Sequence, residues 1–260
     1  MLRSHFLQQW RSLSNLAMEE AFFDVPLYRE FARLDEFVRL PDESTILRFR
    51  HRLETHKLAD GILATVNDLL SRQGLLLKQG SAVDATLMAP PSSTKNKDGK
   101  RDSEMHSSKN GNEWHFGMKV HIGVDADSGL VHAVRGTAGH VADVTEGNAL
   151  LHGQETVVFA DAGYQGADKR PDAVQGVRWQ VAMRPDKPKK LDKAGSPIDA
   201  RINKIEKCKA RVRAKVEHPF RLNQAPVWLR EGALPGPEET HTAAQNADCA
   251  VHACGWRATH

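Results

Sequence analysis

Two aspartates that stand within apolar segments constrain the fold of this chain more than any other feature. Asp84 lies inside the strand-like run Ala82–Leu87, and Asp161 directly follows the apolar run Thr156–Ala160. Open α/β sheets place their ligand-binding groups at the carboxyl ends of strands. A buried carboxylate is costly without a partner, so each aspartate requires a metal, a base or a hydrogen-bond network. For either residue alone, an aspartate that merely caps a strand end remains the alternative.

The segments around these aspartates predict a mixed α/β sheet flanked by helices. Period-two alternation and turn residues predict a meander of three strands, followed by alternating helices and strands. The expected strands span 82–87, 114–124, 130–134, 156–160 and 179–183, and the expected helices span 143–151, 167–174 and 198–221. Residues 90–112 are expected to form a long polar loop.

The chain divides into three predicted parts. Residues 1–76 carry helical periodicity, with a helix start at Pro41-Asp42-Glu43-Ser44, and are expected to form an all-α module that binds DNA. Residues 77–221 contain the sheet and are expected to form the catalytic domain. Residues 222–260 lose all periodicity, contain helix-breaking prolines, and are expected to be an irregular, disordered tail.

A third acid, Glu217, completes a pattern that none of the acids shows alone. Glu217 follows Asp161 on the last expected helix, where an isolated glutamate is usually a solvated ion-pair partner. Acids on the first strand, on the fourth strand and on a later helix follow the order of RNase-H-like nucleases. Three convergent carboxylates suit Mg²⁺ or Mn²⁺. Two such ions, roughly 4 Å apart, can assist phosphodiester cleavage.

Composition restricts the setting but not the reaction. The chain has three cysteines, too few for a disulfide framework, and no apolar run of the roughly 18 residues that a membrane span needs. These features predict a soluble, cytoplasmic protein. The formal net charge is only +3, so the placement of the basic residues matters more than their sum.

Basic residues are clustered where DNA would have to pass. Neutralisation of phosphates by lysine and arginine supports sequence-independent binding, although an ordinary charged helix surface is the alternative for the first cluster. The candidates for contact with DNA are Arg48, Arg50, Arg52, Lys95, Lys97, Lys100, Arg101, Lys119, Lys209 and Arg213.

The sequence also resembles the DDE transposases of the insertion-sequence-five group over most of residues 1–221. The segments that carry the resemblance include Gln8-Gln9-Trp10, 42–50, Val83-Asp84-Ala85-Thr86, 92–101, Phe116-Gly117-Met118-Lys119, 161–166 and 213–220. The resemblance implies that Asp84, Asp161 and Glu217 are the catalytic triad and metal ligands. It also implies that Arg213 matches the family's arginine four residues before the glutamate. The tyrosine that some members have three residues before this arginine is Ala210 here.

The resemblance implies a DNA transposase. Such an enzyme hydrolyses the ends of an insertion sequence, and the released 3′-hydroxyl then attacks target DNA. The implied partners are the terminal inverted repeats and the target DNA, on which the protein is expected to act as a homodimer or higher oligomer. One alternative is a non-catalytic DNA-binding remnant that represses an intact copy or has no function. Another is a cellular RNase-H-like nuclease, which does not explain the N-terminal helical module.

Both ends of the sequence depart from the expected family pattern. One back-translation of 223–239, shifted by one nucleotide, encodes IKRQFGYVKVRYRGLKK, a basic stretch that resembles what the family carries after Glu217. We therefore expect that a nucleotide inserted after the codon for Leu222 put the tail out of frame. The family's basic residue seven positions after the glutamate is Gln224 here. Met1 is expected to be an internal start, because relatives carry a further basic segment before it. An impaired transposase is therefore the prediction.

Overall fold

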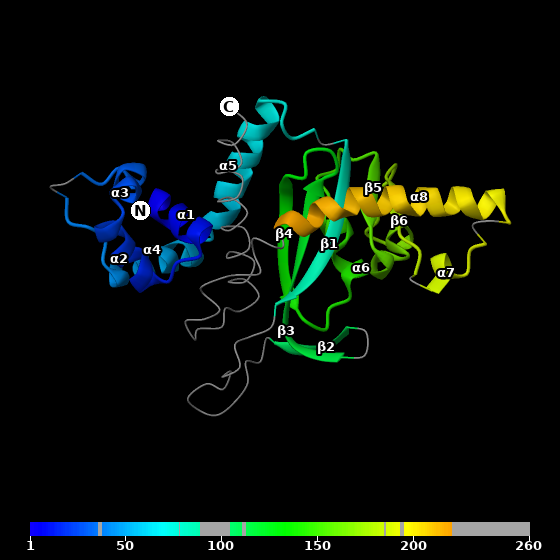
Figure 1. Cartoon of the computed structure of the whole chain (residues 1–260), viewed down its shortest axis with the longest axis horizontal. Coiled ribbons are helices and arrows are strands. Elements are labelled where there is room, and N and C mark those ends of the chain that lie inside the picture. Colours follow the sequence, from blue (N-terminus) through cyan, green and yellow to red (C-terminus); the bar gives the residue numbers. More distant parts are fainter. Residues whose placement is uncertain are drawn as a thin grey trace.

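The computed structural model describes residues 1–35, 38–77, 79–88, 105–110, 113–184, 186–192 and 195–219. It confirms the predicted class, in which N-terminal helices precede a mixed sheet flanked by helices (Figure 1). In these ranges, no helix is both long and apolar enough to cross a membrane.

Five helices precede the sheet. They are α1 (Leu2–Arg11), α2 (Asn15–Asp24), α3 (Pro26–Ala32), α4 (Glu43–Thr55) and α5 (Leu58–Arg72). The Asp42 side chain caps α4 by accepting the Thr45 N–H at 2.7 Å, which confirms the helix start predicted there. Met18 and Phe22 of α2 are fully buried in a cluster that also contains Leu7 and Ile46. The first four helices therefore have a core of their own, and α5 leads from them to the sheet (Figure 1).

The sheet has the order β2-β3-β1-β5-β6, and β4 also pairs with β3. The strands are β1 (Gly80–Met88), β2 (His106–Asn110), β3 (Glu113–Asp125), β4 (Val131–Ala138), β5 (Val157–Ala160) and β6 (Arg178–Val181). Strand β3 is antiparallel to β1, β2 and β4, whereas β5 is parallel to β1 and β6. The predicted meander of β1, β3 and β4 is therefore confirmed.

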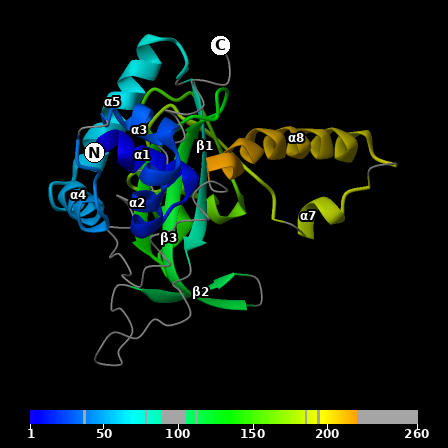
Figure 2. The ribbon, with the colours of Figure 1, turned by 60° about the vertical axis from the view of Figure 1, so that its left-hand side comes forward.

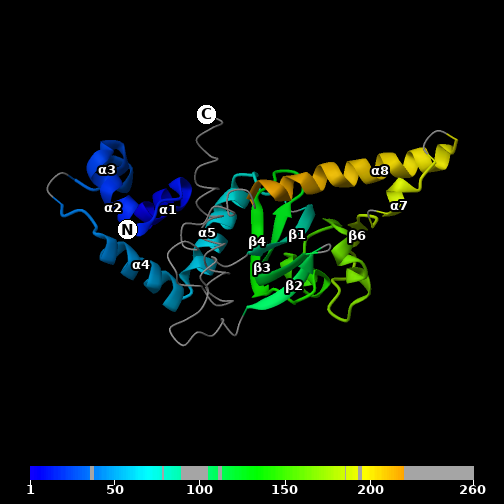
Figure 3. The same cartoon turned by 60° about the horizontal axis from the view of Figure 1, so that its bottom comes forward.

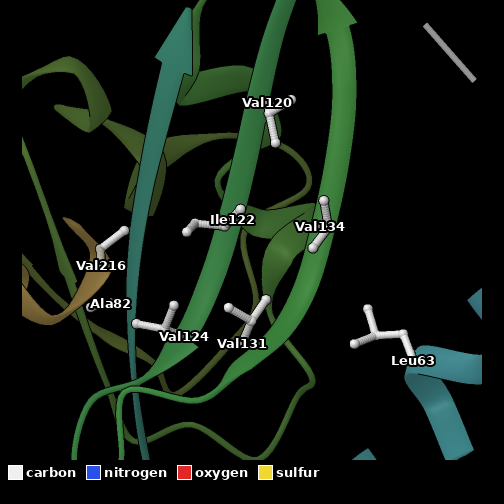
Figure 4. Close-up of a cluster of buried hydrophobic side chains, with 8 residues drawn as sticks. All are labelled: Leu63, Ala82, Val120, Ile122, Val124, Val131, Val134 and Val216. Carbon is white, nitrogen blue, oxygen red and sulfur yellow. The ribbon is translucent and has the colours of Figure 1, made fainter. Parts of the chain in front are cut away.

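Alternate residues of the strands face two different apolar layers. Ala82, Ile122 and Val124 are completely buried in a layer that is closed by Leu63 of α5 and by Val216 (Figure 4). Val83 and Val158 face the other layer, where the fully buried Leu150 and Tyr164 cover them. Because successive strand residues point to opposite faces, Asp84 shares the face of Ala82.

Short helices and one long helix cover the sheet. The short ones are α6 (Asp143–Glu146), α7 (Asp186–Lys189) and the 3₁₀ turns η1 (Asn148–Leu150), η2 (Ala162–Tyr164), η3 (Ala167–Lys169) and η4 (Ala214–Val216). The long helix α8 (Pro197–Arg213) contacts β1 and β5 and continues into η4. Its N-terminal part extends beyond the sheet beside α7 (Figures 2 and 3).

Two local predictions were wrong, and one predicted helix differs from the structure only in detail. The helix expected over 167–174 is only the turn η3, because Pro171 forces Arg170 into an extended conformation with ψ of 155°. The helix expected over 198–221 is α-helical from Pro197 to Arg213, passes through the 3₁₀ turn η4 and is helical again over 217–219, while 220 and 221 lie outside the described residues. Part of the expected loop 90–112 is β2, a polar strand without apolar alternation that pairs with the start of β3.

Candidate active site

Two parallel strands bring Asp84 and Asp161 together. Val83 of β1 is paired with Ala160 of β5, so the next residues of the two strands are Asp84 and Asp161. The Asp161 carboxylate caps η2 by accepting the Gly163 N–H at 2.9 Å, and Asp84 accepts the Ala85 N–H at 2.8 Å. The structure thus juxtaposes two of the three predicted acids at the middle of the sheet.

The surroundings of Asp84 favour its protonated form. Burial raises its pKa from 3.8 to about 6, and the negative charges of Asp161 and Asp143 add to this rise. The Ala85 N–H and the positive charge of Arg213 act in the opposite direction. A carboxyl group whose pKa lies this close to neutral pH can exchange its proton for a cation.

Asp143, at the start of α6, is a third carboxylate of this cluster, and sequence reasoning missed it. A Cβ atom built on Gly163 would lie 3.1 Å from Asp143 Oδ2 and 3.0 Å from Asp161 Oδ1. The Oδ1 atom of Asp143 accepts a hydrogen bond from Lys119 Nζ at 2.9 Å. The absent side chain of Gly163 therefore leaves the space between two carboxylates open.

Lys119 was predicted to contact DNA, but its side chain is only 13% exposed. Its ammonium group also donates to the Val141 carbonyl at 2.9 Å. The structure therefore gives Lys119 the task of fixing Asp143. A lysine among the apolar residues of β3 was the signal that could have revealed a nearby carboxylate.

Arg213 ends α8 and Glu217 follows η4, on the side of the sheet that this helix contacts. The guanidinium of Arg213 lowers the pKa of Asp84, and its Nε atom is buried without a hydrogen-bond partner. Val216 is fully buried against the sheet, whereas Glu217, which follows η4, is exposed. Lys215 anchors η4 by donating to the carbonyl oxygens of Ala126 and Asp127 at 2.7 and 2.8 Å. The structure thus brings Arg213 next to Asp84 and leaves Glu217 at the surface.

The buried Tyr164 lies close enough to the cluster to interact electrostatically with its carboxylates. Burial raises its pKa well above 10, and the carboxylates of Asp143, Asp84 and Asp161 act in the same direction. Its ring stacks on Trp179 with 6.5 Å between the centroids. Gly147 allows this packing, because a Cβ atom there would lie 3.0 Å from Tyr164 and 3.1 Å from Trp179.

The carboxylate cluster fits a hard divalent cation. Asp84, Asp161 and Asp143 offer oxygen ligands, the type that Mg²⁺ and Mn²⁺ prefer. The missing Cβ of Gly163 leaves room beside two of them, and the pKa of Asp84 is raised first by burial and then by the charges of Asp161 and Asp143.

The predicted DNA-binding residues occupy different environments. Arg48 and Arg52 are exposed on α4, whereas Arg50 is 16% exposed and lies 3.8 Å from Glu54. Lys209 is 15% exposed and contacts Glu206 and the Val181 carbonyl at 2.9 and 3.1 Å. Four further candidates, Lys95, Lys97, Lys100 and Arg101, lie outside the described residues, as does the tail 220–260.

Two family models match this chain. Residues 76–227, which are more than half of the sequence, match the model described as a transposase DDE domain. Residues 1–52 match the model described as a transposase domain (DUF772). No solved structure matches the chain.

Proposed function

Since the chain belongs to the DDE transposase family, we propose that it is a bacterial insertion-sequence transposase of the insertion-sequence-five group. Its substrates are then the terminal inverted repeats of its own element and a target DNA. It acts in the cytoplasm at the nucleoid, as a homodimer or higher oligomer on DNA. Residues 1–76 bind DNA, and residues 77–221 carry out the reaction.

The observation that supports this proposal best is the juxtaposition of Asp84 and Asp161 with the rise in the Asp84 pKa to about 6. We assign Asp84, Asp161 and Glu217 as the metal ligands. The chemistry that two bound Mg²⁺ or Mn²⁺ ions would supply is activation of the attacking oxygen and stabilisation of the leaving oxygen. Asp143, which forms an ion pair with Lys119, adds a third carboxylate to the cluster and so strengthens its attraction for cations.

Basic residues near this site and on α4 can bind the phosphates of DNA. Arg213 lies beside Asp84, where its fixed charge can bind a phosphate oxygen. The exposed Arg48 and Arg52 of α4 can neutralise phosphates away from the site. Lys95, Lys97, Lys100 and Arg101 follow β1 in sequence, so the same role is proposed for them.

Strand cleavage tests the proposal directly. The substrate is duplex DNA from the two ends of the element that contains this gene, incubated with purified protein and Mg²⁺ or Mn²⁺. Asp161→Asn is the control, because asparagine keeps the size of the side chain and removes its charge. Cleavage that disappears in Asp161→Asn supports the proposal. Equal cleavage by both proteins would refute the assignment of Asp161.

A non-catalytic remnant is the second candidate, and the exposure of Glu217 favours it. Such a remnant binds the element ends and occupies them without cutting. Glu217→Gln and Asp143→Asn separate the two cases in the cleavage assay. Loss of activity only in Glu217→Gln supports the predicted triad. Loss only in Asp143→Asn assigns the third acid to Asp143, and no activity in the parent chain favours the remnant.

We also propose that the tail after Leu222 is read out of frame, which would explain impaired activity. The nucleotide sequence of the gene decides this point. A basic stretch in the alternative frame over the codons for 223–239 supports the proposal, and its absence contradicts it. Where that frame exists, a gene with the frame restored should encode a protein that cleaves element ends faster than the present chain.

A further inference from the structure

Two histidines and a glutamate converge on the face of the sheet opposite Asp84. The side chains of His132, His152 and Glu155 each offer one ligand atom, and these three atoms all lie within 4.8 Å of one another. The two imidazole rings meet edge to face with 4.9 Å between their centroids. His152 Nε2 lies 3.3 Å from Glu155 Oε1. This group of residues, His132, His152 and Glu155, is called the histidine cluster below.

The fold holds the histidine cluster tightly from three directions. His132 comes from β4, whereas His152 and Glu155 come from the segment between η1 and β5. Ser81 of β1 links them, because its Oγ lies 2.9 Å from His132 Nε2 and donates to Glu155 Oε1 at 3.1 Å. Gly123 of β3 gives the His132 ring its place, since a Cβ atom there would lie 2.8 Å from His132 Cε1. The cluster is thus held in place by contacts from β1, β3 and β4.

The charge of the buried carboxylate points to a cation. The side chain of Glu155 is 0% exposed, and it accepts the N–H groups of His152 and Gly153, each at 2.8 Å. These donors and Ser81 are neutral. The Gln154 N–H donates to His152 Nδ1 at 3.2 Å. A metal ion among the three side chains would balance the charge of Glu155.

We propose that the histidine cluster is a zinc site that ties the start of β1 to β4 and to the segment before β5. Two imidazoles and a carboxylate are a common donor set for Zn²⁺, with a water molecule as the fourth ligand. Ligands around tetrahedral zinc are roughly 3.4 Å apart, so the side chains must close by about 1 Å. The ion takes the Nε2 lone pair of His152, the proton moves to Nδ1, and the 3.2 Å contact from Gln154 is given up. Ser81 then orients Glu155 from the second shell of ligands.

This site is separate from the carboxylate cluster of the proposed active site. Ser81 and Asp84 are three residues apart on one strand, and therefore their side chains point to opposite faces of the sheet. The donor sets also differ, because imidazole nitrogens favour zinc and an all-carboxylate cluster favours magnesium or manganese. Zinc bound to the histidine cluster would fix the strands from which Asp84 and Asp161 project.

Metal binding by the purified full chain tests this inference without any assay of cleavage. The protein is stripped with a chelator and titrated with Zn²⁺, and with Co²⁺ as a spectroscopic probe of four-coordinate geometry. The bound metal is counted by elemental mass spectrometry after desalting. The parent chain and Asp161→Asn are both expected to retain one equivalent of Zn²⁺. His152→Ala is expected to lose this equivalent, together with the visible absorption of bound Co²⁺.

Two further measurements guard against a variant that merely unfolds. The histidine pair His106 and His140 has ring centroids 4.3 Å apart and belongs to no three-ligand group among the described residues, so His140→Ala is the matched control and should keep its zinc. Zinc should also raise the melting temperature of the parent chain and of His140→Ala, but not that of a folded His152→Ala or Glu155→Gln. Zinc retained by His152→Ala, or lost from Asp161→Asn alone, would place the ion elsewhere. A parent chain that retains no zinc would overturn the inference.

Discussion

Replacing Asp84 by asparagine should stabilise the metal-free protein at neutral pH. The pKa of Asp84 is raised from 3.8 to about 6, mainly by burial. One pKa unit corresponds to about 1.4 kcal/mol, so ionising Asp84 costs the folded state about 3 kcal/mol at most. Because the folded chain holds this proton more tightly than the unfolded chain, the contribution of Asp84 to stability is complete below pH 3.8. It declines as the pH rises and is lost above about pH 6.

Asparagine cannot ionise, so Asp84→Asn avoids this loss. We expect the variant to be more stable than the parent by up to about 3 kcal/mol at pH 7.5, and the difference to vanish near pH 4. Urea unfolding of both proteins in a chelator, at several pH values, measures this difference while the other titrating groups cancel. A variant that is less stable than the parent at pH 7.5, or a difference independent of pH, would refute the reasoning. Added Mg²⁺ should stabilise the parent more than the variant, because it replaces the proton at Asp84.

Three other changes test the remaining parts of the structure. Gly163→Ala puts a methyl group about 3 Å from oxygens of Asp161 and Asp143. The variant should therefore bind Mn²⁺ at the carboxylates at least tenfold more weakly, as measured by calorimetry. An unchanged affinity would show that the cation does not use this space. Tyr164→Phe removes a buried hydroxyl that has no hydrogen-bond partner among the described residues, so it should leave stability unchanged or raise it by about 1 kcal/mol in urea unfolding, and a marked loss would reveal a partner. Ile122→Ala leaves a cavity in a fully buried site and should lower the free energy of unfolding by about 2–5 kcal/mol, whereas a smaller effect would indicate that the layer collapses around it.

The fold was predictable wherever the signal is local. The cap at Asp42 and the apolar runs before Asp161 and around Asp84 each determine their own element, and the structure confirms them. Strand β2 was missed because Ser107 and Ser108 carry no apolar alternation, and β2 exists through its hydrogen bonds to β3. The expected helix over 167–174 failed because apolar spacing was given more weight than Pro171, which restricts the residue before it.

The site was predictable only in part, for a related reason. Asp84 and Asp161 stand out because their sequence neighbours are apolar, whereas Asp143 begins the short helix α6 after β4, where an acidic residue is common. Its place beside Asp161 arises only when the chain returns to the carboxyl end of β5. The positions of Lys119 beside Asp143 and of Arg213 beside Asp84 are also tertiary facts. Lys119, a charged residue in a buried strand, was the available clue to Asp143, and its predicted contact with DNA stays a prediction.

The charges at the carboxylate cluster explain why this site attracts a cation. Asp84, Asp161 and Asp143 bring three negative charges when ionised, and Lys119 and Arg213 bring two positive charges. One net negative charge remains. Because the pKa of Asp84 is about 6, the metal-free protein can neutralise this charge by binding a proton at Asp84. A divalent cation competes with that proton and gains the attraction of all three carboxylates. Because protons and the cation compete for Asp84, the affinity for the cation falls as the pH drops below about 6.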